Sequence, residues 1–178
     1  MKRAEKFIII LDGPMGAGKS TVGELLAKRL KRTAIVNEDK IKWFISDFKR
    51  CKRDNAIVRA VLIAMCKEYL QQGINLVVSQ GFSKITRPLA PFAAMAKKNN
   101  CRFFVYHLNA PKDVLLKRIK MRKTSKNVRV PIAQSRIHRN IRTWNANRYF
   151  IGKEFQTENM SAEKIARAIL REVKSIIK

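Results

Sequence analysis

Residues 7–21 read FIIILDGPMGAGKST, an apolar run that ends in an acid and continues into a glycine-rich turn. The turn fits the pattern GxxxxGK[ST] at Gly13, Gly18, Lys19 and Ser20. It stands between a strand-like run and the helix-like stretch STVGELLAKRL. Glycines let successive backbone N–H groups point at phosphate oxygens, and the helix that follows adds its positive N-terminus. The stretch therefore predicts a loop that binds a nucleoside triphosphate.

Each polar side chain of this loop has an expected contact. The Lys19 ammonium is expected to reach the β and γ phosphates, the Ser20 hydroxyl to coordinate Mg²⁺, and the Thr21 hydroxyl to donate to the α phosphate. A chance glycine turn is the alternative, but it does not explain why strand, loop and helix stand in register. The expected nucleotide-binding residues are Gly13, Met15, Gly16, Ala17, Gly18, Lys19, Ser20 and Thr21.

Length and cysteine usage set the class of protein. The 178 residues suit one domain, residues 1–178, that buries its core without help from disulfides or a structural metal. Cys51, Cys66 and Cys101 are odd in number and far apart, which argues against a disulfide framework or a zinc site and favours a reducing cytoplasm. Asp12 interrupts the first apolar run, and no later run is long enough to cross a bilayer. We expect a soluble, cytoplasmic protein.

The charge is strongly positive and unevenly distributed. The chain has 39 Lys and Arg against 13 Asp and Glu, a net charge of +26, and residues 111–150 alone carry +11. Such an excess favours polyanionic partners, including nucleic acid. A lysine-rich solvated surface would give the same total. The function therefore has to be judged from where the charges fall.

Apolar runs alternate with helical patterns, which is typical of an α/β domain with a parallel sheet. A helix is expected from Asn55 to Gln72, ending at the cap residue Gly73, with Ile57, Val61, Ala64, Met65 and Tyr69 in the core. Ser161 is a candidate N-cap for the last helix. Strands are expected at residues 6–11, 34–36, 75–78 and 102–108, and near Phe155.

A kinase also needs a group that acts on the phosphate acceptor. The segment VNEDKIKWF follows the second expected strand and places Asp39 at its carboxyl end, where ligands of open α/β sheets bind. Asp39 is our candidate general base, because a carboxylate there accepts the proton of an attacking hydroxyl. The alternative is a helix N-cap, a role that can coexist with the first. Lys42 shares the same side of the helix and either holds an anionic acceptor or is solvated.

The stretch RIKMRK supplies two more candidates. Arg118 and Arg122 lie four residues apart on an expected helix, so both point the same way, as a lid over a transferring phosphoryl group requires. Arginine suits this role because its planar donors bind phosphate oxygens in pairs. The alternative is a surface helix that buries Val114, Leu115 and Ile119. We expect a lid over about residues 118–135.

With these motifs in place, the whole chain resembles the small P-loop kinases of the group that contains polynucleotide kinase, zeta-type toxins and chloramphenicol phosphotransferase. The matching elements are GPMGAGKST, NEDKIK with Asp39 as base, GFSKITRPL with Arg87 as a substrate-binding residue, LNAPKDVLLKRIKMR with the lid arginines, and TENMSAEKIARAI. The resemblance implies a P-loop NTPase fold like that of nucleoside-monophosphate kinases. Such a fold is a three-layer sandwich around a five-stranded parallel sheet of order 2-3-1-4-5, with a helical lid. It also implies ATP with Mg²⁺ and transfer of the γ-phosphate to a hydroxyl group.

Two positions depart from the family pattern. Relatives usually carry an acid at the end of the third strand, where this chain has Ser79 and Gln80. Polynucleotide kinases carry a second arginine where this chain has Lys42, and a lysine does not make the same paired contact. The acceptor is therefore less well determined than the reaction class.

Three functions remain open at this point. The first is a kinase that phosphorylates a polynucleotide 5′-hydroxyl or another phosphate-bearing molecule, favoured by KRCKR beside the acceptor site and by SRIHRNIRTWNANRYF. That second stretch places Ile137, Ile141 and Trp144 on one helical stripe. The other stripe, expected to follow a phosphate backbone, holds Arg136, Arg139, Asn140 and Thr143. The second is a kinase of a small metabolite, a nucleoside or an antibiotic. The third is a nucleotide-dependent RNA-binding switch with little transfer activity. Sequence alone predicts neither the preference for ATP over GTP nor the oligomeric state.

Overall fold

The strand-forming runs of the sequence assemble into one parallel sheet. The structure, a computed structural model, describes residues 6–81, 89–123, 133–146 and 151–177. Its five strands lie in the order β2-β3-β1-β4-β5, and every neighbouring pair is parallel, as expected from the sequence. The strands are β1 (Phe7–Asp12), β2 (Thr33–Val36), β3 (Asn75–Ser79), β4 (Arg102–Asn109) and β5 (Lys153–Gln156).

The central position of β1 explains why its sequence is a continuous apolar run. A strand covered on both faces has no solvent side, so its side chains do not alternate between apolar and polar. All six residues of β1 are buried, and the strand pairs with β3 on one side and β4 on the other. In this register Leu11 stands beside Ser79, and Asp12 stands beside His107.

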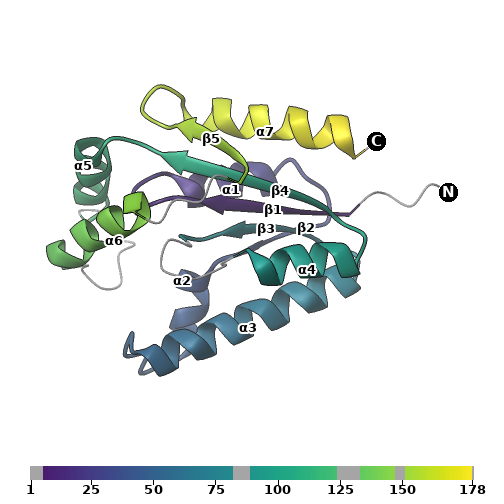
Figure 1. Cartoon of the computed structure of the whole chain (residues 1–178), viewed down its shortest axis with the longest axis horizontal. Coiled ribbons are helices and arrows are strands. Elements are labelled where there is room, and N and C mark those ends of the chain that lie inside the picture. Colours follow the sequence, from purple (N-terminus) through teal and green to yellow (C-terminus); the bar gives the residue numbers. More distant parts are fainter. Residues whose placement is uncertain (1–5, 82–88, 124–132, 147–150, 178) are drawn as a thin grey trace.

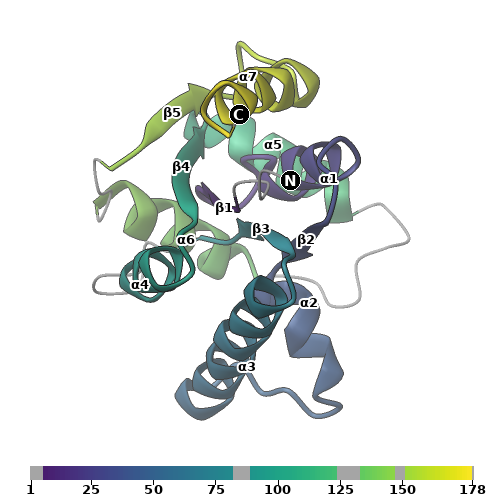
Figure 2. The same ribbon diagram turned by 90° about the vertical axis from the view of Figure 1, so that its right-hand side faces the viewer.

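Helices cover both faces of the sheet (Figures 1 and 2). On one face α1 (Lys19–Ala27) and α7 (Ala162–Ile176) bury a cluster that includes Val22, Leu26 and Ile169. On the other face α3 (Lys52–Gln71) and α4 (Ala90–Lys98) bury a second cluster that includes Leu62 and Phe92. The two clusters form the apolar layers of the three-layer sandwich.

The remaining helices gather where the strands end. In Figure 1 the strands run toward the end of the molecule that carries α2 (Glu38–Ile41), α5 (Lys112–Lys123) and α6 (Gln134–Ala146), away from the labelled chain ends. A short 3₁₀ turn, η1 (Lys42–Phe44), continues α2. The carboxyl ends of parallel strands are where such folds bind ligands.

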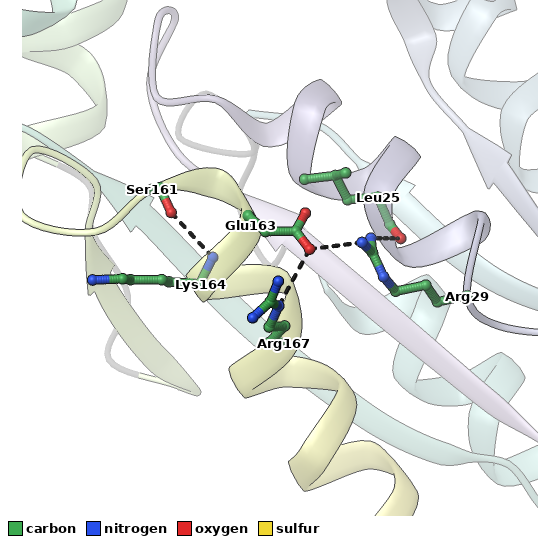
Figure 3. A network of polar contacts seen from close by, with 6 residues as sticks. All are labelled: Leu25, Arg29, Ser161, Glu163, Lys164 and Arg167. Carbon is green, nitrogen blue, oxygen red and sulfur yellow. Dashed lines mark hydrogen bonds and ion pairs between the residues drawn. The ribbon is translucent and has the colours of Figure 1, made fainter.

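A polar network joins α7 to α1 (Figure 3). The Ser161 hydroxyl oxygen accepts the Lys164 N–H at 3.2 Å, so Ser161 is the N-cap expected from the sequence. Arg29 donates to Glu163 at 2.6 Å and to the Leu25 carbonyl oxygen at 3.0 Å. Arg167 adds a second contact to Glu163 at 3.3 Å. Exposed pairs of this kind each contribute less than about 1 kcal/mol, so they align the two helices more than they stabilise them.

The expected core face of α3 is only partly correct, because Met65 and Tyr69 are half-buried and pack against the core whereas the other three expected residues are exposed. Ile57 and Val61 are 43% and 40% exposed, and Ala64 is also exposed. The buried positions are one residue further along, at Val58, Leu62, Cys66 and Leu70. Gly73 does follow the end of this helix, with a φ of +74°. Apolar residues occur on more than one side of α3, so the pattern alone did not decide which side faces the sheet.

All three cysteines are free thiols, as expected from their spacing. Among the described helices, none is both long and apolar enough to span a membrane.

Candidate nucleotide and acceptor site

The glycine-rich loop after β1 follows a path that only glycine can take at two points. Gly13 has a φ of +149°, and a side chain there would overlap the carbonyl oxygen of Leu108 on β4. Gly16 has a φ of +84°, and its Cβ would stand 2.8 Å from the carbonyl oxygen of Leu115 on α5. The loop is therefore pressed between β4 and α5, and its conformation requires both glycines.

The polar side chains of the loop lie around its open side. The Lys19 ammonium donates to the carbonyl oxygens of Gly13 (2.8 Å) and Pro14 (2.9 Å), so it is folded over the loop. Ser20 and Thr21 occupy the first turn of α1 and are exposed. This arrangement matches a phosphate-binding loop in which the helix N-terminus, its N–H groups and one ammonium share a single face.

A cavity of about 340 Å³ adjoins the loop on the side of α7. Its lining includes Gly18 and Thr21 from the loop, Arg118 from α5, and Thr157 and Ser161 from the connection between β5 and α7. Arg118 forms part of the wall because its guanidinium donates to the Thr157 hydroxyl and carbonyl oxygens, each at 2.7 Å. The predicted contact of Arg118 with a transferring phosphoryl group stays a prediction.

Asp39 lies on α2, beside a lysine that neutralises it. Lys42 Nζ stands 2.6 Å from Asp39 Oδ1, and the Lys42 side chain is only 15% exposed whereas that of Asp39 is 80% exposed. The cap of α2 is Asn37, whose side-chain oxygen accepts the Asp39 N–H at 2.7 Å. The alternative interpretation of Asp39 as the N-cap is therefore wrong, and its carboxylate remains open to solvent.

The charge balance around Asp39 keeps its carboxylate ionised. Desolvation by surrounding protein atoms raises the pKa of Asp39, and the charge and hydrogen bond of the Lys42 ammonium are the strongest of the effects that lower it. The positive charges of Lys19 and Arg50 lower the pKa further, and the net shift is downward. Since the Lys19 charge acts on Asp39, the phosphate-binding loop and α2 contribute to one electrostatic site.

Helix α6 closes the same site from the other side. The Asn140 side-chain oxygen accepts the Met15 N–H at 2.8 Å, which fastens α6 to the tip of the loop. Ile137, Ile141 and Trp144 are buried beneath the helix, as their spacing predicts. Arg136 lies one turn before Asn140, so it shares the helix face that meets the loop.

The arginines at this face repel one another. Desolvation lowers the pKa of Arg136, the charges of Arg50 and Arg139 lower it further, and the charge of Asp39 only partly compensates. Arg50 also stands over the Trp43 ring, 5.8 Å from its centroid. We call Lys42, Arg50, Arg136 and Arg139 the cationic cluster. Positive charges crowded around one carboxylate that is already paired favour an added anion.

Two polar side chains at the end of β3 have oxygens without protein partners. Ser79 Oγ and Gln80 Oε1 are buried and accept or donate no hydrogen bond within the described part of the chain. Buried polar atoms normally have a partner, which is often water or a ligand. Both oxygens are of the kind that bind Mg²⁺ or its coordinated water. The chain therefore offers two neutral, buried oxygens at the end of β3.

Some predicted residues fall outside the described parts. Arg87 and residues 124–132 of the expected lid are not described, and nor is the side chain of Arg122. Sequence reasoning assigned Arg136, Arg139 and Asn140 to a surface that follows nucleic acid. It placed KRCKR, which contains Arg50, beside the acceptor site, but it did not predict the contact between Asn140 and the loop. A half-buried asparagine that contacts a glycine-rich loop leaves no spacing signal, because its partner lies 125 residues away.

Comparisons with known proteins agree with this geometry. A family model described as an AAA domain matches residues 8–150. A probable adenylyl-sulfate kinase of Pyrococcus abyssi is 30% identical over 119 residues, which cover 64% of this chain and 66% of the relative. A shikimate kinase of Psychrobacter arcticus is 31% identical over 137 residues, which cover 71% of this chain and 63% of the relative. The chain thus spans slightly less than two thirds of the length of these curated relatives.

Solved structures support the fold. The Mycobacterium tuberculosis APS kinase CysC, in complex with AMPPNP and APS, superimposes with a TM-score of 0.67 over 96% of this chain and 99% of that chain. The sequence identity is 14%, so this likeness concerns the fold. Together with the glycine-rich loop and the sheet order, the family match over residues 8–150 shows that this chain is a P-loop protein of the AAA domain family.

Proposed function

We propose that the protein is an ATP-dependent kinase that transfers a γ-phosphate to a hydroxyl group. The observation that carries the proposal is the Asp39 carboxylate, which is exposed, held at 2.6 Å from Lys42, and subject to the charge of Lys19 in the phosphate-binding loop. A base placed across a triphosphate site is what phosphoryl transfer to a hydroxyl requires. The names of the curated relatives, both kinases, support this activity.

In this proposal the nucleotide and the acceptor bind on opposite sides of the phosphate-binding loop. Backbone N–H groups of residues 13–21 and the Lys19 ammonium would hold the phosphates. The nucleotide base would enter the cavity beside Thr157, where Arg118 fixes the wall. Asp39 would orient the acceptor hydroxyl and receive its proton, and Arg122 stays our candidate for the lid.

Mg²⁺ would be held by the Ser20 hydroxyl and the nucleotide phosphates. Ser79 and Gln80 would bond to its coordinated waters, because their buried oxygens have no other partner in the described structure. The ion would supply positive charge to the phosphate oxygens, and the protein would hold the ion in its place beside the phosphates.

We propose a small anionic metabolite as the acceptor. The cationic cluster favours an acceptor that carries a phosphate, sulfate or carboxylate group, because planar guanidinium donors bind such anions in pairs. Adenylyl sulfate and shikimate, named for the relatives, are both anions. A polynucleotide with a free 5′-hydroxyl is the second candidate, since its terminal phosphates would meet the same arginines. The cationic cluster lies beside Asp39, so binding of a small anionic acceptor would account for the positive charge at this place.

A phosphate-transfer screen tests the proposal. Wild type and Asp39→Asn are incubated with γ-labelled ATP, Mg²⁺ and three acceptor sets: anionic hydroxylated metabolites, their neutral analogues, and 5′-hydroxyl oligonucleotides. We expect transfer to an anionic metabolite, at a rate that Asp39→Asn lowers roughly a hundredfold while ATP affinity is kept. Transfer to oligonucleotides alone would make the second candidate correct. ATP binding without transfer to any acceptor would favour the RNA-binding switch and exclude the kinase.

A further inference from the structure

An acidic side chain lies buried directly beneath the phosphate-binding loop. Asp12 ends β1 and is 1% exposed, and its Oδ1 accepts the Gly13 N–H at 2.7 Å. That hydrogen bond fixes the first residue of the loop. A buried carboxylate is costly unless it is paired, and one placed below a triphosphate would also repel it in a medium of low dielectric constant. The loop therefore needs a compensating charge at this point.

The compensating group is a histidine on the neighbouring strand. His107 stands beside Asp12 in the β1–β4 register and is 6% exposed. Its Nδ1 lies 3.3 Å from Asp12 Oδ2, and its Nε2 lies 2.7 Å from the Ile151 carbonyl oxygen. A carbonyl oxygen and an ionised carboxylate only accept hydrogen bonds, so with Asp12 ionised both ring nitrogens carry a proton. This geometry describes an imidazolium.

We propose that His107 is a positioning residue that acts through Asp12: as an imidazolium it neutralises the buried carboxylate and holds it on the Gly13 N–H, so that the loop accepts an anionic triphosphate. The inference rests on the nucleotide-binding part of the proposed function and is independent of the acceptor. His107 itself touches neither nucleotide nor acceptor in this role. The same ring also ties the loop to Ile151, the residue that leads into β5.

The proposal has a defined pH dependence. Burial lowers the pKa of His107, but hydrogen bonds to Asp12 and Ile151 and the charges of Asp12 and Glu154 raise it more, and the net shift is upward from 6.5. These two acids, from β1 and β5, both favour the charged form of the ring. The neutralising charge is fully present below pH 6.5 and is lost as the pH rises through the raised pKa. Nucleotide affinity should fall over the same interval.

Nucleotide affinity of three variants tests the proposal without reference to activity. Titration calorimetry with a non-hydrolysable ATP analogue and Mg²⁺ is carried out from pH 6 to pH 9. His107→Gln keeps a donor and removes the charge, and should lose roughly tenfold in affinity at low pH, the equivalent of about one pKa unit, with a flat profile. Asp12→Asn with His107→Gln removes both charges and should recover affinity. Thermal unfolding checks that each variant is folded.

An NMR titration of the wild-type ring does not depend on any variant folding. The His107 ring signal should titrate above pH 6.5, and bound nucleotide should move that pKa higher still, because the added anion favours the charged ring. A ring that is neutral at pH 6, or a folded His107→Gln with wild-type affinity and pH profile, would overturn the inference. Lys19→Ala separates the two proposals: if it too leaves affinity unchanged, the loop does not bind nucleotide and the proposed function itself fails.

Discussion

Two opposing effects act on the single carboxyl group of Asp39. Neighbouring protein atoms desolvate it and raise its pKa, whereas the Lys42 ammonium at 2.6 Å lowers that pKa and, together with Lys19 and Arg50, makes the net shift downward. Lys42 therefore has a role that the sequence left open between acceptor binding and simple solvation. It tunes the candidate base, and with one donor engaged it still has two for an anion.

Replacement of Lys42 by methionine should raise the pKa of Asp39. Without the ammonium, desolvation is opposed by the weaker effects of Lys19 and Arg50, so the carboxyl group protonates at higher pH. A base works when deprotonated, so the acid limb of the turnover profile should move to higher pH. NMR titration of the Asp39 carboxyl carbon measures the shift directly. Lys40→Met, at an exposed neighbour, is the charge-matched control, and equal profiles for both variants would contradict the prediction.

Among single residues, the sequence predicted best the positions of those that lie close together along the chain. Lys19, Ser20 and Asp39 could be placed because loop, strand and helix follow one another within about thirty residues. Asn37 was missed as a cap, although asparagine is among the preferred cap residues, because Asp39 two positions later suits the same role. The Asp12–His107 pair could not be found, since its members meet only through strand pairing.

Among the elements, α6 matters most for the site because one hydrogen bond couples it to the loop. The bond between Asn140 and the Met15 N–H holds the helix that carries Arg136 and Arg139. Neither the helix pattern nor the loop motif predicts this contact. The buried stripe of α6 was predictable because its apolar residues all lie on one face, whereas α3 has apolar residues on several faces. Packing against the sheet decided the register of α3, and a helical period does not report packing.

Removal of the Asn140 side chain should loosen α6. Asn140→Ala leaves the Met15 N–H without its partner, so we expect a loss of about 1 kcal/mol in the free energy of unfolding. Turnover should fall by more than stability alone explains, because the arginines of α6 lose their place opposite Asp39. Urea unfolding and steady-state kinetics measure the two effects. Asn145→Ala, at an exposed position of the same helix, is the control and should change neither. A wild-type rate for Asn140→Ala would show that the contact is incidental.

Over the whole molecule, the net charge of +26 and the cationic cluster would attract a polyanion in two different ways. A general field attracts any oligonucleotide weakly, whichever face carries the charge. A specific binding site releases counterions from the nucleic acid only at the phosphates that its side chains contact. The sequence showed the total charge and its concentration in residues 111–150, but not that Arg50 joins Arg136 and Arg139 beside Asp39. Chain segments that far apart meet only in the finished fold.

Two double variants with the same change in charge distinguish these cases. Arg136→Glu with Arg139→Glu alters the cationic cluster, and Arg171→Glu with Lys174→Glu alters an exposed part of α7. If the acceptor is a small metabolite, both pairs should lower oligonucleotide affinity slightly and equally, while only the first raises the KM of the acceptor. Fluorescence anisotropy across a salt series gives the slopes. A much flatter slope for the first pair alone would show phosphates bound at the cluster and would favour the polynucleotide.

The strand order has a consequence for how the chain is made. Because β1 lies between β3 and β4, its partners are residues 75–79 and 102–109, and parallel strands cannot close through a short hairpin. On the ribosome, FIIIL emerges before both of its partner strands, and its two edges can pair only after residues 75–79 and 102–109 have been made. A run that is apolar on both faces and open on both edges is an aggregation hazard for that interval. The segment that later supports the nucleotide is therefore the one that a nascent-chain chaperone has most reason to hold.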